Sequence, residues 1–392
     1  MKLVYISAGI GIHVEAIADT FYKLLGDDFC FISTKQPTGK EGIHKFAEMG
    51  REYHSKPYNL CVWESEVNEK KAYELIEKAD VVIAGGTQFH YFINRVNERK
   101  CTFLCNERWF KKPFYLISIR GWKFLFGTLR RIQNENFHFL ALGAYCANDA
   151  QFLKIFNDRI YQFAYLVPIE KYDVKQLLET KRNKKTRIMW CARFIDWKHP
   201  ELVVDLAKRL VKNNYFNFEI TMVGGNTPLQ DKIKRKILKN GLKDYISIIE
   251  GLPNSDVRKL MLQSNIFLVT SDRKEGWGAV LNEAMGSGCA VVASNQIGAT
   301  PVLIKNGVNG LVFKSKSVES LYQNVKLLLD DTGTMEQMAI GAYDTVTSEW
   351  SSENVARRFL ELSKSILEGN PVVFTSGPCS KALPCNEYLV CL

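Results

Sequence analysis

Two carboxylates, Glu275 and Glu283, lie eight residues apart in the segment EGWGAVLNE. Gly276, Trp277 and Gly278 follow the first of them, and Glu283 falls on what reads as a short helix. Free N–H groups in such a turn, with the positive end of a helix behind them, favour binding of an anion. Carboxylates accept hydrogen bonds from hydroxyl groups. The combination suits a sugar attached to a phosphate.

An apolar strand pattern flanks this segment on each side. Residues 265–270 (NIFLVT) precede it, and residues 289–293 (CAVVA) follow a Gly-Ser-Gly stop. The order strand, glycine loop, short helix, strand predicts a βαβ unit in a parallel sheet. Ligands bind at the carboxyl edge of such sheets, so we expect the glycine loop to lie in a binding crevice.

Arg193 and Lys198 follow another predicted strand, residues 187–192 (RIMWCA). Arginine and lysine are suited to the oxygens of a diphosphate leaving group; the alternative is a pair of solvated surface charges. The carboxylate loop about 80 residues later in the same predicted domain favours the first interpretation. The chain has no D-x-D motif. We therefore expect cationic side chains and helix N-termini to neutralise the leaving group, with no metal site and no cofactor.

The N-terminal half offers a second group of candidates in the segment GIGIH, which follows a strand pattern at 2–7. Gly9 and Gly11 resemble a dinucleotide fingerprint, but Val14 occupies the third glycine position, so the motif fails. A turn that approaches a phosphate or sugar and a turn without a ligand remain alternatives. His13 and His90, both expected on loops, are candidate acceptor-side bases or simply packed or surface residues.

Residues 100–131 combine eight Lys or Arg residues with a single acid, Glu107, and with interleaved aromatic residues. One interpretation is contact with an anionic membrane surface. The other is a buried strand at 114–119 flanked by solvated charges. The net charge of +10 has the same two explanations, a membrane surface or anionic substrates, since no nucleic-acid-binding motif accompanies it. We expect no nucleic-acid partner.

The 392 residues alternate strand and helix patterns throughout, which predicts an α/β protein with two doubly wound, Rossmann-like domains. The expected domains are 1–168 and 169–351, with a helix at 352–367 packing back on the first domain and an irregular tail at 368–392. The charged segment 173–185 reads as the linker. Further predicted strands lie at 30–33, 80–84, 137–142, 163–166, 218–223 and 245–249; predicted helices lie at 14–25, 68–78, 200–211, 229–237, 256–263 (capped by Ser255) and 318–329.

No apolar run approaches the roughly 18 residues that a membrane span needs. The N-terminal apolar run continues into an amphipathic helix pattern, so it reads as a first buried strand rather than as a signal peptide. Many of the ten cysteines fall inside apolar strand patterns, as expected of free thiols in a reducing compartment. We expect a cytoplasmic protein, peripheral on the inner face of the plasma membrane if the basic stretch binds lipid.

The chain resembles the retaining GT-B glycosyltransferases of family 4, also called group 1. The resemblance rests on Glu275 and Glu283 inside SDRKEGWGAVLNEAMGSGCAVVAS, on Arg193 with Lys198, and on the segment GATPVLIKNGVNGLVF at 298–313. It covers the second predicted domain nearly end to end, whereas the first matches only in pattern. One residue departs from the family: His199 replaces the usual glycine after the motif lysine.

The resemblance implies two Rossmann-like domains facing across a cleft, with a UDP- or GDP-linked sugar held mainly by the second. It implies that Arg193 and Lys198 hold the diphosphate and Glu283 the ribose hydroxyls. Glu275 and the Gly276–Gly278 amides would hold the sugar, with Glu275 either stabilising positive charge or attacking as a nucleophile.

The implied activity is transfer of a hexose-type sugar, with retention, to a saccharide or lipid-linked acceptor in capsule or lipopolysaccharide assembly. The alternatives are a GT-B epimerase or phosphorylase, and a non-catalytic nucleotide-sugar-binding protein.

Overall fold

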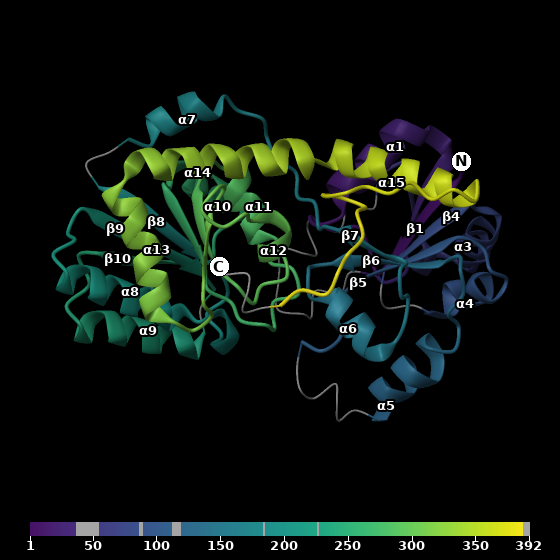
Figure 1. Ribbon diagram of the computed structural model, residues 1–392, viewed down its shortest axis with the longest axis horizontal. Helices are drawn as coiled ribbons and strands as arrows, with labels where there is room; N and C mark the ends of the chain where they lie inside the picture. The colour runs from purple at the N-terminus through teal and green to yellow at the C-terminus, as the bar shows by residue number, and fades with distance from the viewer. Residues whose placement is uncertain (37–54, 86–88, 112–118, 183–184, 226, 387–392) are drawn as a thin grey trace. The chain divides into compact units, whose positions relative to one another are not determined.

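The computed structural model describes residues 1–392 except 37–54, 86–88, 112–118, 183–184, 226 and 387–392. The chain divides into two compact units. The first unit contains Met1–Pro168 and, later in the chain, Trp350–Cys385, while the second contains Ile169–Glu349. Each unit is built on its own sheet, and every strand pair in both sheets is parallel (Figure 1).

The sheet of the first unit has seven strands within the described residues, in the order β3-β2-β1-β4-β5-β6-β7. Its strands are short apolar runs, which is typical of parallel strands that are covered on both faces. They are β1 (Leu3–Ser7), β2 (Phe29–Ser33), β3 (Asn59–Cys61), β4 (Val81–Gly85), β5 (Thr102–Glu107), β6 (Phe137–Leu142) and β7 (Ile160–Phe163). The helices of this unit are α1 (Glu15–Leu25), α3 (Glu66–Lys78), α4 (Phe89–Asn97), α5 (Ile119–Trp122), α6 (Cys146–Leu153) and α15 (Ser352–Leu367).

Helices cover both faces of this first sheet. On one face, α3, α4 and α6 pack against alternate strand residues such as Val4, Ile6 and Phe139. On the other face, α1 packs against α15, the helix that returns from the far end of the chain. Phe359 of α15 is fully buried, with its ring 5.6 Å from that of Phe21 and 5.0 Å from that of Phe103. This aromatic cluster joins α15 to the first unit.

The sheet of the second unit has six strands within the described residues, in the order β10-β9-β8-β11-β12-β13. They are β8 (Thr186–Cys191), β9 (Phe218–Gly224), β10 (Ile246–Glu250), β11 (Ile266–Val269), β12 (Ala290–Ser294) and β13 (Leu311–Phe313). The helices are α7 (Val174–Thr180), α8 (Pro200–Lys212), α9 (Pro228–Lys239), α10 (Asn254–Gln263), α11 (Val280–Gly286), α12 (Thr300–Leu303), α13 (Val318–Asp330) and α14 (Thr332–Asp344).

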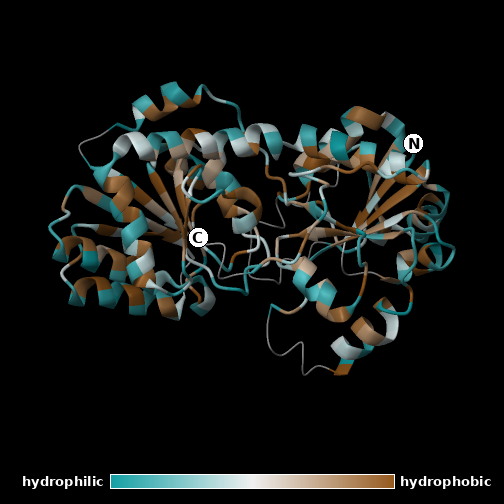
Figure 2. Ribbon diagram, in the orientation of Figure 1, coloured by the Kyte–Doolittle hydropathy of each residue, from teal (hydrophilic) through white to brown (hydrophobic). Residues whose placement is uncertain are grey.

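The helices of the second unit form two groups. Helix α8 packs against α9 and α13, while α11 packs against α10 and α14. Figure 2 shows that the strands are apolar along their length, whereas the helices carry one apolar and one polar face. The apolar face of each helix can therefore pack against the sheet. Two doubly wound α/β units, each on a parallel sheet, are therefore confirmed.

The strand orders place a topological switch point in each unit. In the second sheet, β8 pairs with both β9 and β11, so the chain winds outward in opposite directions from the β8–β11 pair. In the first sheet, β1 and β4 hold the equivalent place. Binding crevices open at such points, at the carboxyl ends of the strands. The loops that follow β8 and β11 carry Lys198 and Glu275.

Some predicted elements differ from those observed. The expected strand at 114–119 lies almost wholly outside the described residues, and its last residue, Ile119, begins α5 instead. No strand was predicted at the position of β5, which pairs with β4. Its last two residues, Asn106 and Glu107, are polar and interrupt the apolar pattern. Within the expected linker, α7 forms because the Asp173 side chain caps its first turn.

Two further boundaries were wrong. Helix α10 begins at Asn254, two residues before the start that a Ser255 cap predicts, and it follows Pro253 with no side-chain cap. The last strand of the first sheet is Ile160–Phe163 rather than 163–166. In both places the turn chemistry is weak, and element ends are the least determined part of a sequence pattern.

Candidate functional site

The two predicted charges that matter most, Lys198 and Glu275, form a direct ion pair. Both side chains are largely buried, with 12% and 15% of their surface exposed. The two residues are 77 positions apart in the sequence and lie on the loops that follow β8 and β11. The adjacency of those two strands in the sheet brings them together, at the switch point where a ligand is expected.

Side chains between the two strands hold these loops in register. The indole Nε1–H of Trp190 donates to Oγ1 of Thr270 at 2.8 Å, and the Thr270 hydroxyl donates to the carbonyl of Lys198 at 2.6 Å. Trp190 and Thr270 are each about 1% exposed. A buried, fully used hydroxyl of this kind fixes the backbone that carries Lys198.

Arg193 and Trp197 complete the loop after β8. Arg193 is exposed. Its guanidinium carbon lies 6.0 Å from the centre of the Trp197 ring, while Nζ of Lys198 lies 4.4 Å from the same centre. Cations are attracted to an aromatic face at such distances. The ring of Trp197 therefore keeps both predicted diphosphate ligands on one loop surface.

The loop that carries Glu275 depends on glycine at position 278. Gly278 has a φ of +95°, and a Cβ there would lie 2.9 Å from a methyl carbon of Ile297 and 3.3 Å from Cγ of Glu275. A side chain would therefore both strain the backbone and press on Glu275. Trp277 is fully buried, and its Nε1–H donates to Oδ1 of Asn282 at 2.9 Å. The indole is a core anchor, so only the main chain of Trp277 is available to a ligand.

The segment after β12 braces this loop from behind. The N–H of Gly298 donates to the carbonyl of Glu275 at 3.3 Å, and that of Ala299 donates to the carbonyl of Trp277 at 3.0 Å. Among the described residues, none accepts a hydrogen bond from the N–H groups of residues 276–278. These three amides are the predicted sugar- or phosphate-facing donors.

Glu283 lies on α11 and is 7% exposed. Its Oε1 accepts a hydrogen bond from Nδ2 of Asn254, at the start of α10, at 3.2 Å. Burial raises the pKa of this carboxyl, and the nearby Arg258 opposes that shift. Cys191, at the end of β8, lies within the field of both Glu283 and Lys198; burial and Glu283 raise its thiol pKa to about 12. Glu283 thus faces the carboxyl end of β8.

The candidates of the first unit lie after β1. His13 is exposed, its ring centre 5.4 Å from that of Tyr165, and its carbonyl accepts a hydrogen bond from the N–H of Leu166. The carbonyl of Gly11 accepts from the N–H groups at the start of α1, and a Cβ at Gly9 would meet nothing within 4 Å. The turn at Gly9 is open, as a ligand-binding turn requires.

The expected loop position of His90 was wrong. His90 lies in the first turn of α4, exposed, with its ring centre 4.2 Å from that of Tyr91. The three residues before this helix, 86–88, are outside the described residues. The sequence GGTQFH reads as a loop because of its glycines, but the apolar stripe of α4 (Tyr91, Phe92 and Val96) extends the helix back to Phe89.

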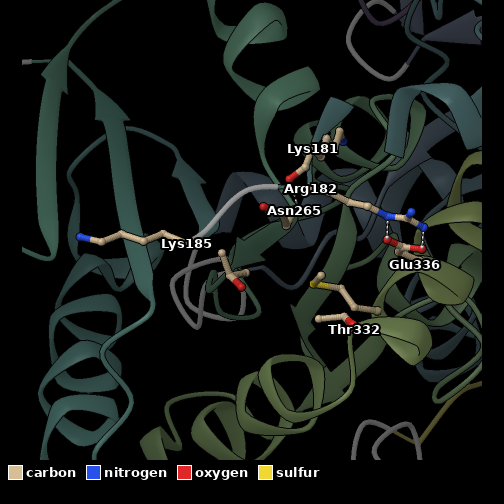
Figure 3. Close-up of a pocket in the computed structure, with 8 residues that line it drawn as sticks. Lys181, Arg182, Lys185, Asn265, Thr332 and Glu336 are labelled. Carbon is tan, nitrogen blue, oxygen red and sulfur yellow. Dashed lines mark hydrogen bonds and ion pairs between the residues drawn. The ribbon is translucent and has the colours of Figure 1, made fainter. Parts of the chain in front are cut away.

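One cavity lies away from these loops. It has a volume of about 150 Å³ and is lined by residues near the amino ends of β8 and β11, including Thr186 and Asn265 (Figure 3). Arg182 is engaged there by Glu336, through two hydrogen bonds of 2.9 Å. The amine of Lys181 donates to the carbonyls of Ser287 and Gly288, at 2.6 Å each. This edge is opposite to the carboxyl edge, so the cavity does not lie where the loops after β8 and β11 predict a ligand.

Two residues at the site were missed as functional candidates. Asp272 and His199 lie beside the ion pair: Nε2 of His199 is 3.2 Å from Oδ2 of Asp272, which is 7% exposed. In the sequence, Asp272 could have been identified as a carboxylate three residues before Glu275, and His199 as the residue that replaces the usual glycine. Neither signal shows that the two side chains meet.

Residues 175–345 match the family model of Glycosyl transferases group 1. This match covers most of the second unit and includes both loops described above.

Among curated proteins, the chain is 25% identical over 198 residues to the amylovoran biosynthesis glycosyltransferase AmsK of Erwinia amylovora, covering 49% of this chain and 47% of that protein. It is 26% identical over 186 residues to the N,N'-diacetylbacillosaminyl-diphospho-undecaprenol alpha-1,3-N-acetylgalactosaminyltransferase of Campylobacter jejuni, covering 47% and 46%. The chain spans about half the length of the curated relatives it matches.

Among solved structures, Anabaena HepE in complex with UDP aligns with 93% of this chain and 100% of its own, at a TM-score of 0.68 and 15% identity. This likeness confirms the predicted fold class, two Rossmann-like α/β domains of the GT-B type, and concerns the fold alone.

Proposed function

We propose that this chain is a retaining glycosyltransferase that moves a hexose-type sugar from a UDP- or GDP-linked donor to a saccharide or lipid-linked acceptor. The observation that carries the proposal is the buried ion pair of Lys198 and Glu275 at the switch point of the second sheet. A cation and a carboxylate held there, beside three unengaged amides, match the diphosphate and the sugar of such a donor.

The pair suggests how a donor would bind. In the absence of ligand each charge compensates the other, which limits the cost of holding both in a partly buried place. A diphosphate would take over Lys198 and be joined by Arg193, leaving Glu275 to accept hydrogen bonds from the sugar. Glu283, on the neighbouring helix, would hold the ribose hydroxyls. Glu275 would then face the carbon at which positive charge develops.

The proposed chemistry uses no metal. The chain lacks a D-x-D motif, and Arg193 and Lys198 already place two cations on the loop that would face the diphosphate. Fixed charges that need no rearrangement during the reaction are effective in stabilising a leaving group.

A thermal-shift screen in excess EDTA tests both the donor class and its independence of metal. UDP-, GDP- and ADP-sugars are compared at equal concentration. A ligand at a hundred times its Kd stabilises a protein by about 2.7 kcal/mol, which is readily measured. We expect a UDP- or GDP-sugar to raise the Tm. Stabilisation that appears only after Mg²⁺ or Mn²⁺ is added would contradict metal independence, and no stabilisation under either condition would contradict the donor site.

Product analysis separates the competing functions. A glycosyltransferase releases the nucleoside diphosphate, by transfer or by slow donor hydrolysis, whereas a non-catalytic nucleotide-sugar-binding protein releases none. A GT-B epimerase would change the configuration of the sugar. A phosphorylase would need a lysine-bound pyridoxal phosphate, which is visible in the absorbance of the purified protein.

The names of the relatives support cell-surface polysaccharide or lipid-linked oligosaccharide assembly as the context. AmsK is named for amylovoran biosynthesis, and the Campylobacter jejuni enzyme acts on a diphospho-undecaprenol substrate. We therefore propose a role in bacterial capsule or lipopolysaccharide assembly on the cytoplasmic side of the membrane. The described cysteines are free thiols, which agrees with a reducing compartment.

Only some of the cations in the basic stretch, residues 100–131, are exposed and unpaired in the described part of the structure. Arg108 is buried against Asp149 at 3.3 Å, Lys100 pairs with Glu77 at 2.6 Å, and Lys111 pairs with Glu107. Four exposed cations remain that have no carboxylate partner among the described residues: Arg120, Lys123, Arg130 and Arg131. They lie near the exposed apolar residues Ile119 (74%) and Trp122 (40%) in the sequence, and these six residues together are called the α5 patch.

We propose that the α5 patch binds an anionic membrane surface peripherally. Apolar side chains that enter the interface, surrounded by cations, are typical of such contacts. Of the helices in the described part of the chain, none is both long and apolar enough to cross a bilayer.

Vesicle binding tests the α5 patch. Each cation near anionic lipid contributes up to about 1 kcal/mol. The double variant Arg130→Gln, Arg131→Gln should therefore lower partitioning onto phosphatidylserine vesicles by up to about thirtyfold. The double variant Lys232→Gln, Lys239→Gln on α9 makes the same change in net charge on the second unit, and should bind like the wild type. Equal loss in both variants, or no vesicle binding by the wild type at low salt, would contradict the patch.

A further inference from the structure

The backbone at His199 has a conformation that normally favours glycine. Its φ is +50° and its ψ is 54°, at the junction between the 3₁₀ turn Asp196–Lys198 and α8. Non-glycine residues are uncommon there, because the Cβ approaches the backbone. A histidine at this place costs more conformational energy than a glycine would, so contacts made by its ring can offset that cost.

The ring of His199 lies between two carboxylates. Nδ1 is 2.8 Å from Oε1 of Glu201, in the first turn of α8, and Nε2 is 3.2 Å from Oδ2 of Asp272, on the loop after β11. An ionised carboxylate only accepts hydrogen bonds, so both ring nitrogens must carry a proton to make both contacts. The geometry therefore fits the imidazolium, and a neutral ring would lose one of the two hydrogen bonds.

Asp272 shapes the loop that carries Glu275. Its Oδ1 accepts a hydrogen bond from the N–H of Lys274 at 3.0 Å, and its carbonyl accepts one from the N–H of Glu275 at 2.9 Å. Its own N–H donates to the carbonyl of Trp197 at 3.0 Å. Asp272 is thus one of the points at which the two loops of the site meet, and His199 follows Lys198 directly.

We propose that His199 is a positioning residue of the donor site, whose protonated ring ties the Lys198 turn to the Glu275 loop, so that nucleotide binding weakens when the ring loses its proton. This inference rests on the proposed donor site, although the tether itself does not depend on any ligand. The tether would hold Lys198 and Glu275 at the spacing that a sugar diphosphate needs. A glycine at position 199 has no side chain with which to make this contact.

Other charged groups lie around the ring on the elements packed against it. They are Asp196 and Lys198 on the preceding turn, Lys236 of α9, which lies near Glu201 and pairs with Asp205 at 2.7 Å, and Lys316, whose Nζ is 3.6 Å from Oδ2 of Asp272. Lys316 is 60% exposed, so solvent screens its effect. The two carboxylates in direct contact dominate.

The direction of the pH effect follows from these contacts. The hydrogen bond with Glu201 raises the pKa of His199 above its ordinary value; burial opposes this, and the contact with Asp272 adds to it. A base whose folded pKa is raised contributes fully below its unfolded pKa, and the contribution disappears as the pH rises through the folded pKa. The tether is therefore strongest at mildly acidic pH, below the ordinary histidine pKa, and is lost as the pH rises through the raised pKa of His199.

A histidine NMR titration tests the tether without any ligand. The chain has six histidines, and the signal of His199 is identified by its loss in His199→Asn, since asparagine tolerates this backbone conformation. We expect the His199 pKa to lie above the ordinary value of about 6.5 and to fall in Asp272→Asn. A His199 pKa at or below the ordinary value, or one that Asp272→Asn leaves unchanged, would overturn the tether whether or not the protein binds a donor.

Calorimetry with UDP, or with GDP if the thermal-shift screen selects it, tests the consequence. His199→Asn and His199→Gly should bind about three- to tenfold more weakly than the wild type at about pH 6.5, the loss expected of one positioning hydrogen bond, and alike at about pH 9. The ratio of the variant's Kd to the wild-type Kd is taken at each pH, because the titration of the nucleotide's own phosphate affects both values equally. A ratio that does not change with pH would overturn the positioning role, while failure of the wild type to bind either nucleotide would overturn the proposed function instead.

Discussion

Glu275→Gln is expected to lower kcat about a hundredfold or more while donor affinity stays near that of the wild type. An electrostatic group that acts mainly on transition-state charge typically contributes a factor of about 10² to 10³. Glutamine keeps the shape of the side chain and an oxygen that can accept from Lys198, so the change removes the negative charge and little else. Donor binding by calorimetry and kcat from steady-state transfer are the two measurements.

Glu283→Gln is the matched comparison, because both variants replace one partly or wholly buried carboxylate by its amide. Glu283 is proposed to hold the ribose, a contact present in both the ground state and the transition state. Its loss removes uniform binding, so KM for the donor should rise, by about tenfold, more than kcat falls. Near-normal kcat in Glu275→Gln, or abolished turnover with intact donor affinity in Glu283→Gln, would contradict this division of roles.

Both comparisons need the same pH and a check of folding. Glu283 is buried, and its carboxylate accepts a hydrogen bond from Asn254. The Tm of each variant should therefore be measured first. Burial raises the pKa of Glu283, which favours its protonated form in the folded protein. Since an amide resembles the protonated acid, the stability of Glu283→Gln should be close to that of the wild type at low pH, where the wild-type carboxyl is protonated.

Lys198→Ala is expected to weaken binding of the free nucleoside diphosphate and of the nucleotide sugar to a similar extent. A charge-assisted hydrogen bond to phosphate is worth about 2 kcal/mol, which corresponds to roughly a thirtyfold rise in Kd. The effect should appear with UDP or GDP alone, because the proposed contact is to the diphosphate rather than to the sugar. Calorimetric titration with each ligand measures it.

A control for Lys198→Ala is needed because the substitution also removes the partner of Glu275. Lys239→Ala, on the exposed side of α9, makes the same change in net charge within the same unit and should leave Kd unchanged. Lys198→Arg keeps the cation and should recover part of the affinity. A loss confined to the nucleotide sugar, with normal binding of the free nucleotide, would place Lys198 at the sugar rather than at the diphosphate.

The sequence by itself determined the strands that the site depends on. The apolar runs that became β6, β8, β9 and β11, and the helix pattern at 352–367 that became α15, are read from local periodicity. The glycine turn after Glu275 is equally local, since Gly278 occupies a backbone conformation that other residues avoid. Such features depend on neighbouring residues, and a sequence pattern records them directly.

The tertiary structure decided which of these elements meet. That β8 lies beside β11 follows from the winding of the whole sheet, so the pairing of Lys198 with Glu275 across 77 residues has no local signal. The same holds for the burial of Arg108 against Asp149, which removes one cation from a stretch that reads as uniformly exposed. It holds also for His199, whose ring reaches Asp272 on the loop of a different strand, from a backbone that turns as a glycine would. Residue types and spacing fix what each side chain can do, whereas the crossovers of a parallel sheet bring distant side chains within reach of one another.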